Sequence, residues 1–196
     1  GENIVSKILL VGVGPMAVDY AKVLKALNID MTVVGRGKES AAHFTNAIGQ
    51  AVQTGGIESW LSNHKRVIPE RAIVAVGEKW LGKAAIMLME HGVKSLLVEK
   101  PAAATAEEAQ DVLRKAREKN AKVYVGYNRR FYSSVRNAQE IIDEDEGVTS
   151  FNFEFTEWSH VIKDLQKEPG VKENWFFHNS THVIDLAFHL GGKPRE

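Results

Sequence analysis

Short apolar runs alternate with longer amphipathic segments over the first part of the chain. Strands that helices cover on both faces of a parallel sheet are apolar at nearly every position, and each covering helix carries one apolar stripe. The pattern predicts strands at 7–11, 31–34, 51–53, 72–76, 96–98 and 122–125. It predicts helices between them at 15–28, 82–91 and 106–119. We therefore expect an α/β fold with a doubly wound parallel sheet.

The pattern changes in the last third of the chain. A further helix is predicted at 132–145, and residues 149–158 then alternate, with Phe151, Phe153 and Phe155 on one face and polar residues on the other. Such alternation is typical of a half-buried strand in an antiparallel sheet. Two domains are therefore expected, an α/β domain at 1–127 and the start of an α+β domain at 128–196.

Composition narrows the classes of function. The 25 basic and 25 acidic residues balance, so no excess of positive charge favours nucleic acid or an anionic membrane. The chain has no cysteine, which excludes disulfides, thiolate metal ligands and a cysteine nucleophile and suits a reducing compartment. It contains neither a long apolar span nor the pattern of a signal peptide. We expect a cytoplasmic protein that acts on a small molecule.

A glycine-rich turn follows the first predicted strand and opens the first predicted helix. In a dinucleotide-binding turn, the first glycine (Gly12) permits the tight turn and the second (Gly14) lets a pyrophosphate approach the positive end of the helix. Pro15 and Met16 begin that helix and are expected to line the same site, and Ala17 stands where a third glycine often does. An ordinary glycine turn is the alternative, but the strand before it and the helix after it favour nucleotide binding.

The end of the second predicted strand indicates which nucleotide binds. An NAD site usually has a carboxylate there for the ribose hydroxyls, whereas an NADP site has a small residue and an arginine for the phosphate. Gly35 and Arg36 occupy these positions, and Ser40 lies shortly after them. Arg36, Lys38 and Ser40 all suit phosphate oxygens. NADP is therefore the expected cofactor, with NAD as the alternative, and a solvated basic turn is the interpretation without function.

A lysine and a histidine follow in an order that suits hydride transfer. Oxidation of a secondary alcohol requires a base near neutrality beside the hydroxyl, and an ammonium group there stabilises developing alkoxide charge. His182 suits the first task and Lys100 the second, although a structural histidine and a surface lysine remain alternatives. His178 would share a helix face with His182. Without a glutamate between them or a clear third ligand, we expect no metal.

The order of these motifs resembles that of one family. The segments are Gly12-Val13-Gly14-Pro15-Met16-Ala17, Glu99-Lys100-Pro101, Gly126-Tyr127-Asn128-Arg129-Arg130-Phe131 and His182-Val183-Ile184-Asp185-Leu186. They are similar to those of the Gfo/Idh/MocA family of NAD(P)-dependent sugar and cyclitol oxidoreductases. The resemblance implies an N-terminal Rossmann domain and an open sheet that supplies the substrate pocket.

The resemblance also implies roles for individual residues. Lys100 would contact both the substrate and the nicotinamide, His182 would transfer the proton, and Glu99 would lie near the nicotinamide ribose. Asn128 and Arg129 would face the junction of the two domains. Ala75 begins the segment that stands in place of the family's small-residue loop, and we expect it to line the cofactor.

Two departures from the family pattern keep a second function open. Many members have an aspartate one helical turn before the histidine, where this chain has His178, and we expect His178 and Asn179 to act as a relay or to contact the substrate. Members also extend far beyond this helix, so the chain is either truncated within its second domain or a natural short member.

An exposed sheet edge invites pairing, so we expect a homo-oligomer through the second sheet. The expected function is an oxidoreductase that transfers a hydride between nicotinamide and a hydroxyl or keto carbon of a sugar, cyclitol or nucleotide sugar. A dinucleotide-binding sensor of a sugar pathway, without turnover, is the alternative.

Overall fold

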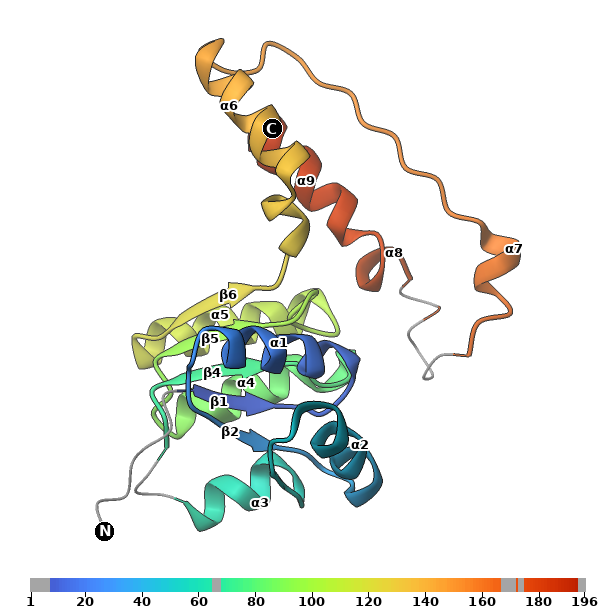
Figure 1. Cartoon of the computed structure of the whole chain (residues 1–196). Coiled ribbons are helices and arrows are strands. Elements are labelled where there is room, and N and C mark those ends of the chain that lie inside the picture. Colours follow the sequence, from blue (N-terminus) through green and yellow to red (C-terminus); the bar gives the residue numbers. More distant parts are fainter. Residues whose placement is uncertain (1–7, 65–67, 167–171, 173–174, 194–196) are drawn as a thin grey trace. The chain divides into compact units, whose positions relative to one another are not determined.

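The computed structural model describes residues 8–64, 68–166, 172 and 175–193. The chain divides into two compact units, Gly1–Gly126 and Tyr127–Glu196. The first contains a sheet flanked by helices, and the described part of the second is built from helices (Figure 1).

A six-stranded parallel sheet forms the centre of the first unit. The strands lie in the order β3-β2-β1-β4-β5-β6, so β1 is central and the order reverses between β1 and β4. An open α/β sheet binds its ligands at the carboxyl ends of the strands beside this reversal. The strands are β1 (Ile8–Val11), β2 (Met31–Val34), β3 (Val52–Gln53), β4 (Arg71–Val74), β5 (Ser95–Val98) and β6 (Lys122–Val125).

Helices cover both faces of the sheet. They are α1 (Pro15–Ala26), α2 (Lys38–Ile48), α3 (Gly56–Asn63), α4 (Leu81–Glu90) and α5 (Ala106–Lys119), with a 3-10 turn η1 (Glu78–Trp80) before α4. Successive strand residues point to opposite faces. Leu10 therefore packs in the core with α1 and α2, and Leu9 packs in the core with α3, α4 and α5. Both leucines are fully buried, which stabilises the fold by roughly 1.5–3 kcal/mol for each side chain.

The structure confirms the α/β fold class and the predicted parallel strands. Their bounds differ from the prediction by at most two residues within the described chain, and residue 7 lies outside the described residues. No helix was predicted where α2 and α3 lie. Their glycine N-caps, Gly37 and Gly55, are typical of turns, but the spacing of the buried residues Ala41, Phe44 and Ile48 was a helical signal.

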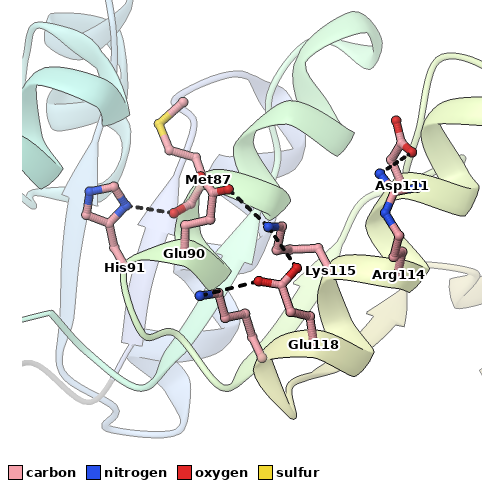
Figure 2. Close-up of polar contacts among 8 residues, drawn as sticks. Met87, Glu90, His91, Asp111, Arg114, Lys115 and Glu118 are labelled. Atoms are coloured by element: carbon pink, nitrogen blue, oxygen red, sulfur yellow. Dashed lines mark hydrogen bonds and ion pairs between the residues drawn. The ribbon is translucent and has the colours of Figure 1, made fainter.

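Polar contacts join α4 and α5 at the surface (Figure 2). Lys115 Nζ of α5 lies 3.2 Å from Glu90 Oε1 and 3.1 Å from Glu118 Oε2, and hydrogen bonds with Glu118 and Glu90 raise the pKa of Lys115. Solvent screens such ion pairs, so they add little to stability. Close packing matters more, because a Cβ on Gly82 of α4 would lie 2.7 Å from Glu108 Cδ of α5.

The described second unit consists of short helices around one longer pair. They are the 3-10 turn η2 (Asn128–Phe131), α6 (Ser133–Glu144), α7 (Ser159–Ile162), α8 (Trp175–His178) and α9 (Thr181–Gly191). Helix α6 packs against α9, which also contacts η2. The predicted helix at 132–145 is therefore confirmed.

The predicted strand at 149–158 is wrong for the described structure. Residues 151–158 have no regular secondary structure and pair with no strand among the described residues. The alternation itself is real, because Phe151 and Phe153 both pack edge-on against Phe188 of α9. A Cβ on Gly191 would lie 2.7 Å from Phe151 Cγ. Alternation thus identified the apolar face, but a strand also needs a neighbouring strand to satisfy its backbone groups.

A matched pair of glycine substitutions tests the turn after β1. Gly12 has φ +120, and a Cβ there would lie 2.7 Å from the carbonyl carbon of Ala75, whereas a Cβ on Gly14 would meet no atom within 4 Å. We expect Gly12→Ala to lower the free energy of unfolding by roughly 3 kcal/mol. Gly14→Ala should lower it by about 1 kcal/mol or less. Urea denaturation followed by circular dichroism measures both, and equal losses would contradict this account of the turn.

Candidate functional site

The first unit gathers its predicted site residues at one edge of the sheet. Gly12, Gly35, Ala75 and Glu99 directly follow β1, β2, β4 and β5, and parallel strands all end at the same edge. Because the strand order reverses between β1 and β4, Gly12 and Ala75 flank the switch point at which such sheets bind dinucleotides.

The glycine turn fits a pyrophosphate. The Gly12 N–H donates to the carbonyl of Val34 at 2.9 Å, which ties the turn to β2. Gly14 is the N-cap of α1 and is exposed, its missing side chain leaves open space, and no side chain caps the helix. The first N–H groups of a helix are without partners inside the helix and attract anions. Pro15 and Met16 begin this helix, and both are exposed.

A cluster of cations on an aromatic ring lies past the end of β2. The Arg36 guanidinium carbon is 4.7 Å from the centroid of the Trp80 ring, and Lys83 Nζ is 5.1 Å from that ring. Neither cation takes part in an ion pair within the described residues. A guanidinium stacked by its face keeps its N–H groups for an anion. Ser40 is exposed in the first turn of α2.

Gly35 sets the backbone from which Arg36 projects. Its N–H donates to the carbonyl of Gln53, and its carbonyl accepts from Gly56, each at 2.9 Å. A Cβ on Gly35 would lie 2.8 Å from Val13 Cγ1, so a larger residue would displace the glycine-turn residue Val13. The turn after β1 and the turn after β2 therefore pack directly against each other, and both contain residues that we expect to bind phosphate.

Glu99 and Lys100 follow β5 at the same edge. The Glu99 N–H donates to the carbonyl of Val74 at 2.9 Å, and its side chain accepts a hydrogen bond from Tyr20 of α1 at 2.5 Å. Burial, and then the hydrogen bond to Glu99, raise the pKa of Tyr20 above its usual value, so its hydroxyl stays protonated and donates. Lys100 is half-buried and precedes a cis peptide bond to Pro101.

In the second unit, His182 lies beside Tyr127, the residue that directly precedes η2. The rings of Tyr127 and His182 meet edge-on with centroids 5.8 Å apart. Arg130 of η2 binds both carboxylate oxygens of Asp185, one turn after His182, and its Nε lies 2.7 Å from Oδ2. The hydrogen bond with Asp185 raises the pKa of Arg130, and burial raises the pKa of Tyr127.

His178 and His182 do not share one helix, contrary to expectation. His178 ends α8 and is buried, and His182 lies near the start of α9. The chain turns at Asn179 and Ser180, whose side chains donate to Glu157 Oε1 at 3.3 and 2.8 Å. Asparagine and serine favour such side-chain bonds over helix interiors. The Ser180 bond lowers the pKa of Glu157.

The remaining predicted site residues lie in different units. Asn128 and Arg129 lie in η2 of the second unit, with Asn128 exposed. Lys100 belongs to the first unit and His182 to the second, so their convergence on one substrate atom stays a prediction. Across the residues that the structure describes, no group of three or more histidine, aspartate or glutamate side chains could hold a metal ion.

The fold and the glycine turn define the first unit as an α/β domain of the Rossmann type. The chain belongs to the Gfo/Idh/MocA family, because residues 6–127 match the model described as oxidoreductase family, NAD-binding Rossmann fold. The family resemblance drawn from the motifs is thereby confirmed.

Relatives share the chain in part. Scyllo-inositol 2-dehydrogenase (NADP(+)) of Bacillus subtilis (strain 168) is 28% identical over 105 residues, which cover 52% of this chain and 29% of that protein. Levoglucosan dehydrogenase of Pseudarthrobacter phenanthrenivorans is 27% identical over 159 residues, covering 74% of this chain and 40% of that protein.

A solved structure shares the fold. The WlbA dehydrogenase from Chromobacterium violaceum, in complex with NADH and UDP-GlcNAcA, superposes with a TM-score of 0.75 at 15% identity, over 98% of this chain and 57% of that one. The chain therefore spans between 29% and 57% of the length of these three proteins. Among the described helices of this chain, none combines the length and apolar character that crossing a membrane requires.

Several residues of the site were not predicted as functional. Trp80 and Lys83 complete the Arg36 cluster, Tyr20 holds Glu99, and Tyr127 contacts His182. Tyr20 lies on an amphipathic helix, and its neighbours in the sequence do not indicate that its partner is Glu99, 79 positions away. Tyr127 lies in the family motif at 126–131, and its position next to Asn128 was the available indication that it belongs to the site.

Proposed function

We propose that this chain binds NADP(H) and supplies the cofactor domain and part of the substrate domain of an oxidoreductase. The substrate would be a CH–OH or keto carbon of a sugar, cyclitol or nucleotide sugar. The open cradle at Gly14, on the same sheet edge as Lys100, carries the proposal. The family and the named activities of its relatives on inositol and levoglucosan support it. A chain without cysteine suits a reducing compartment, and we include a cytoplasmic location in the proposal.

The cofactor would lie across the switch point. Its pyrophosphate fits the N-terminus of α1 at Gly14, and its adenosine half fits the β2 side, where Arg36 and Lys83 offer two cations to a 2′-phosphate. No carboxylate ends β2 to bind the ribose hydroxyls of NAD, since Gly35 and Arg36 follow Val34. Ser40 could donate one further hydrogen bond to the phosphate.

Two side chains would serve the reacting carbon. The bound nicotinamide accepts or supplies the hydride. In the oxidation direction, His182 takes the hydroxyl proton while the Lys100 ammonium donates a hydrogen bond to the same oxygen and stabilises its growing negative charge. In the reduction direction, His182 returns the proton. The Tyr127 ring packs against the His182 imidazole in a T-shaped contact, and the Arg130–Asp185 pair joins α9 to η2.

Substitution of Arg36 tests the cofactor preference. We expect Arg36→Met to weaken NADP(H) binding by about 10- to 100-fold, because one charge-assisted phosphate contact is lost. NAD(H) binding should change by about twofold or less. Calorimetric titration of the full chain with both cofactors gives the ratio, and Lys22→Met, which removes an exposed cation of α1 that has no role in the proposed phosphate site, is the control. A wild-type chain that prefers NAD would contradict the assignment.

Substitution of the two predicted catalytic residues tests the chemistry. Lys100→Met and His182→Ala should each lower turnover by roughly 100-fold or more and leave cofactor affinity within a few-fold, because both groups act mainly in the transition state. The measurement is the change in nicotinamide absorbance with a panel of sugars, cyclitols and nucleotide sugars. His189→Ala, on the same helix, is the matched control.

The same panel separates enzyme from sensor. If the protein binds NADP(H) but turns over none of these compounds, and a sugar instead alters its association with another protein, the enzyme interpretation fails. His178 in place of the family's aspartate is the observation that favours a sensor.

We also propose self-association through the second unit. Phe151 and Phe153 are 46% and 41% exposed although they already pack on α9, and an apolar face of this kind is usually covered. We expect Phe153→Ser to shift the chain toward monomer in light scattering at micromolar concentration. A wild-type chain that is already monomeric would rule out this interface.

A further inference from the structure

Three elements that are far apart in the sequence meet at one hydrogen bond of the first unit. Tyr20, in the second turn of α1, donates from its hydroxyl to Oε1 of Glu99, 79 positions later, at 2.5 Å. Both residues are half-buried. A hydroxyl bonded to an ionised carboxylate is among the stronger neutral-to-charged hydrogen bonds, and partial burial strengthens it further.

The third element is Gly126, directly after β6. A Cβ on Gly126 would lie 2.9 Å from Glu99 Oε1 and 3.1 Å from the Tyr20 hydroxyl oxygen. The Gly126 N–H donates to the carbonyl of Val98 at 2.8 Å, so this backbone is held in place against β5. The missing side chain of Gly126 therefore leaves the space in which the Tyr20–Glu99 pair lies.

The backbone of Glu99 is fixed on both sides. Its N–H donates to Val74 of β4 at 2.9 Å, and its carbonyl accepts from Ala102 at 2.8 Å, which closes the turn that contains Lys100. Because the backbone of Glu99 is held, the hydrogen bond from Tyr20 determines the rotamer of the Glu99 side chain. The Tyr20 bond occupies Oε1 and leaves the second carboxylate oxygen as an acceptor.

The order of the sheet places this carboxylate relative to a dinucleotide. Arg36 lies past β2 and the α1 N-terminus lies past β1, so the phosphates and the adenosine half of a bound dinucleotide would take up that side of the switch point. The other half must then extend over the ends of β4 and β5. Glu99 lies at the end of β5, on the nicotinamide side.

We propose that Tyr20 is a positioning residue that holds the Glu99 carboxylate toward the nicotinamide half of the cofactor. The inference rests on the proposed function and adds a residue to it. A neutral tyrosine suits this role, since its high pKa keeps it a donor at any pH at which the protein works. Tyr20 acts only through Glu99 and touches no reacting atom.

A pair of ligands separates this role from a general structural one. NADPH carries the nicotinamide and its ribose, and 2′-phospho-ADP is the same molecule without either. We expect Tyr20→Phe to weaken NADPH binding by roughly 5- to 10-fold, which is the range of one ordinary hydrogen bond, because Glu99 itself remains and loses only the bond that orients it, and to leave binding of the fragment within about twofold. Fluorescence titration of the full chain measures NADPH, and calorimetry measures the fragment. Tyr124→Phe, an exposed tyrosine on β6, is the matched control and should change neither.

A second variant reaches the same pair from the opposite side. Gly126→Ala should displace the Glu99 carboxylate and give the same selective loss of NADPH, with thermal unfolding followed in parallel for every variant. If Tyr20→Phe weakens both ligands equally, or weakens neither, Tyr20 does not position Glu99. If the unsubstituted chain binds the fragment but gains nothing from the nicotinamide, the role of Tyr20 is overturned while the phosphate site stands. Failure of the unsubstituted chain to bind either ligand overturns the proposed function together with this inference.

Discussion

The carbonyl of Ala75 lies against the bare backbone of Gly12, and this steric constraint sets the geometry of the whole carboxyl edge. A side chain at Gly12 would separate the turn after β1 from the turn after β4 and would need a backbone conformation that other residues rarely adopt. With the two turns in contact, the first turn of α1 opens at the point where the strand order reverses. The anion-binding end of the helix and the switch point of the sheet thus coincide because one residue has no Cβ.

Glycine serves a different purpose at each of the other turns of this edge. Gly14 leaves space that a ligand can fill, Gly35 lets Arg36 leave β2 beside Val13, and Gly126 makes room for the half-buried pair of Tyr20 and Glu99. The result is an edge whose two halves differ in charge. Exposed cations stacked on Trp80 lie on the β2 side, and a carboxylate held by Tyr20 lies at the end of β5. The charge distribution of a dinucleotide is complementary, with most of its negative charge in the phosphates and little negative charge at the nicotinamide.

In the second unit, hydrogen bonds between side chains hold the elements together, whereas in the first unit glycines let the turns pack closely. Arg130 and Asp185 join η2 to α9, and Glu157 accepts hydrogen bonds from two side chains of the turn between α8 and α9. These pairs join motif residues that the sequence had placed in separate segments. They also explain why Asp185 accompanies His182, since the carboxylate holds the helix while the Tyr127 ring lies against the imidazole.

The sequence by itself determined the parallel sheet, the glycine turn at its first strand and the family. The sheet and the turn depend on residues close together in the chain, whose spacing reports directly on burial or on a turn, and the family follows from the order of several such short motifs. Only the tertiary structure decided that residues 151–158 find no strand partner, that His178 and His182 lie on different helices, and that Tyr20 and Trp80 belong to the site. The reason is physical: a partner 79 positions away leaves no periodic trace in the sequence, and a hydrogen bond or a stacked cation forms only when folding brings the two groups together.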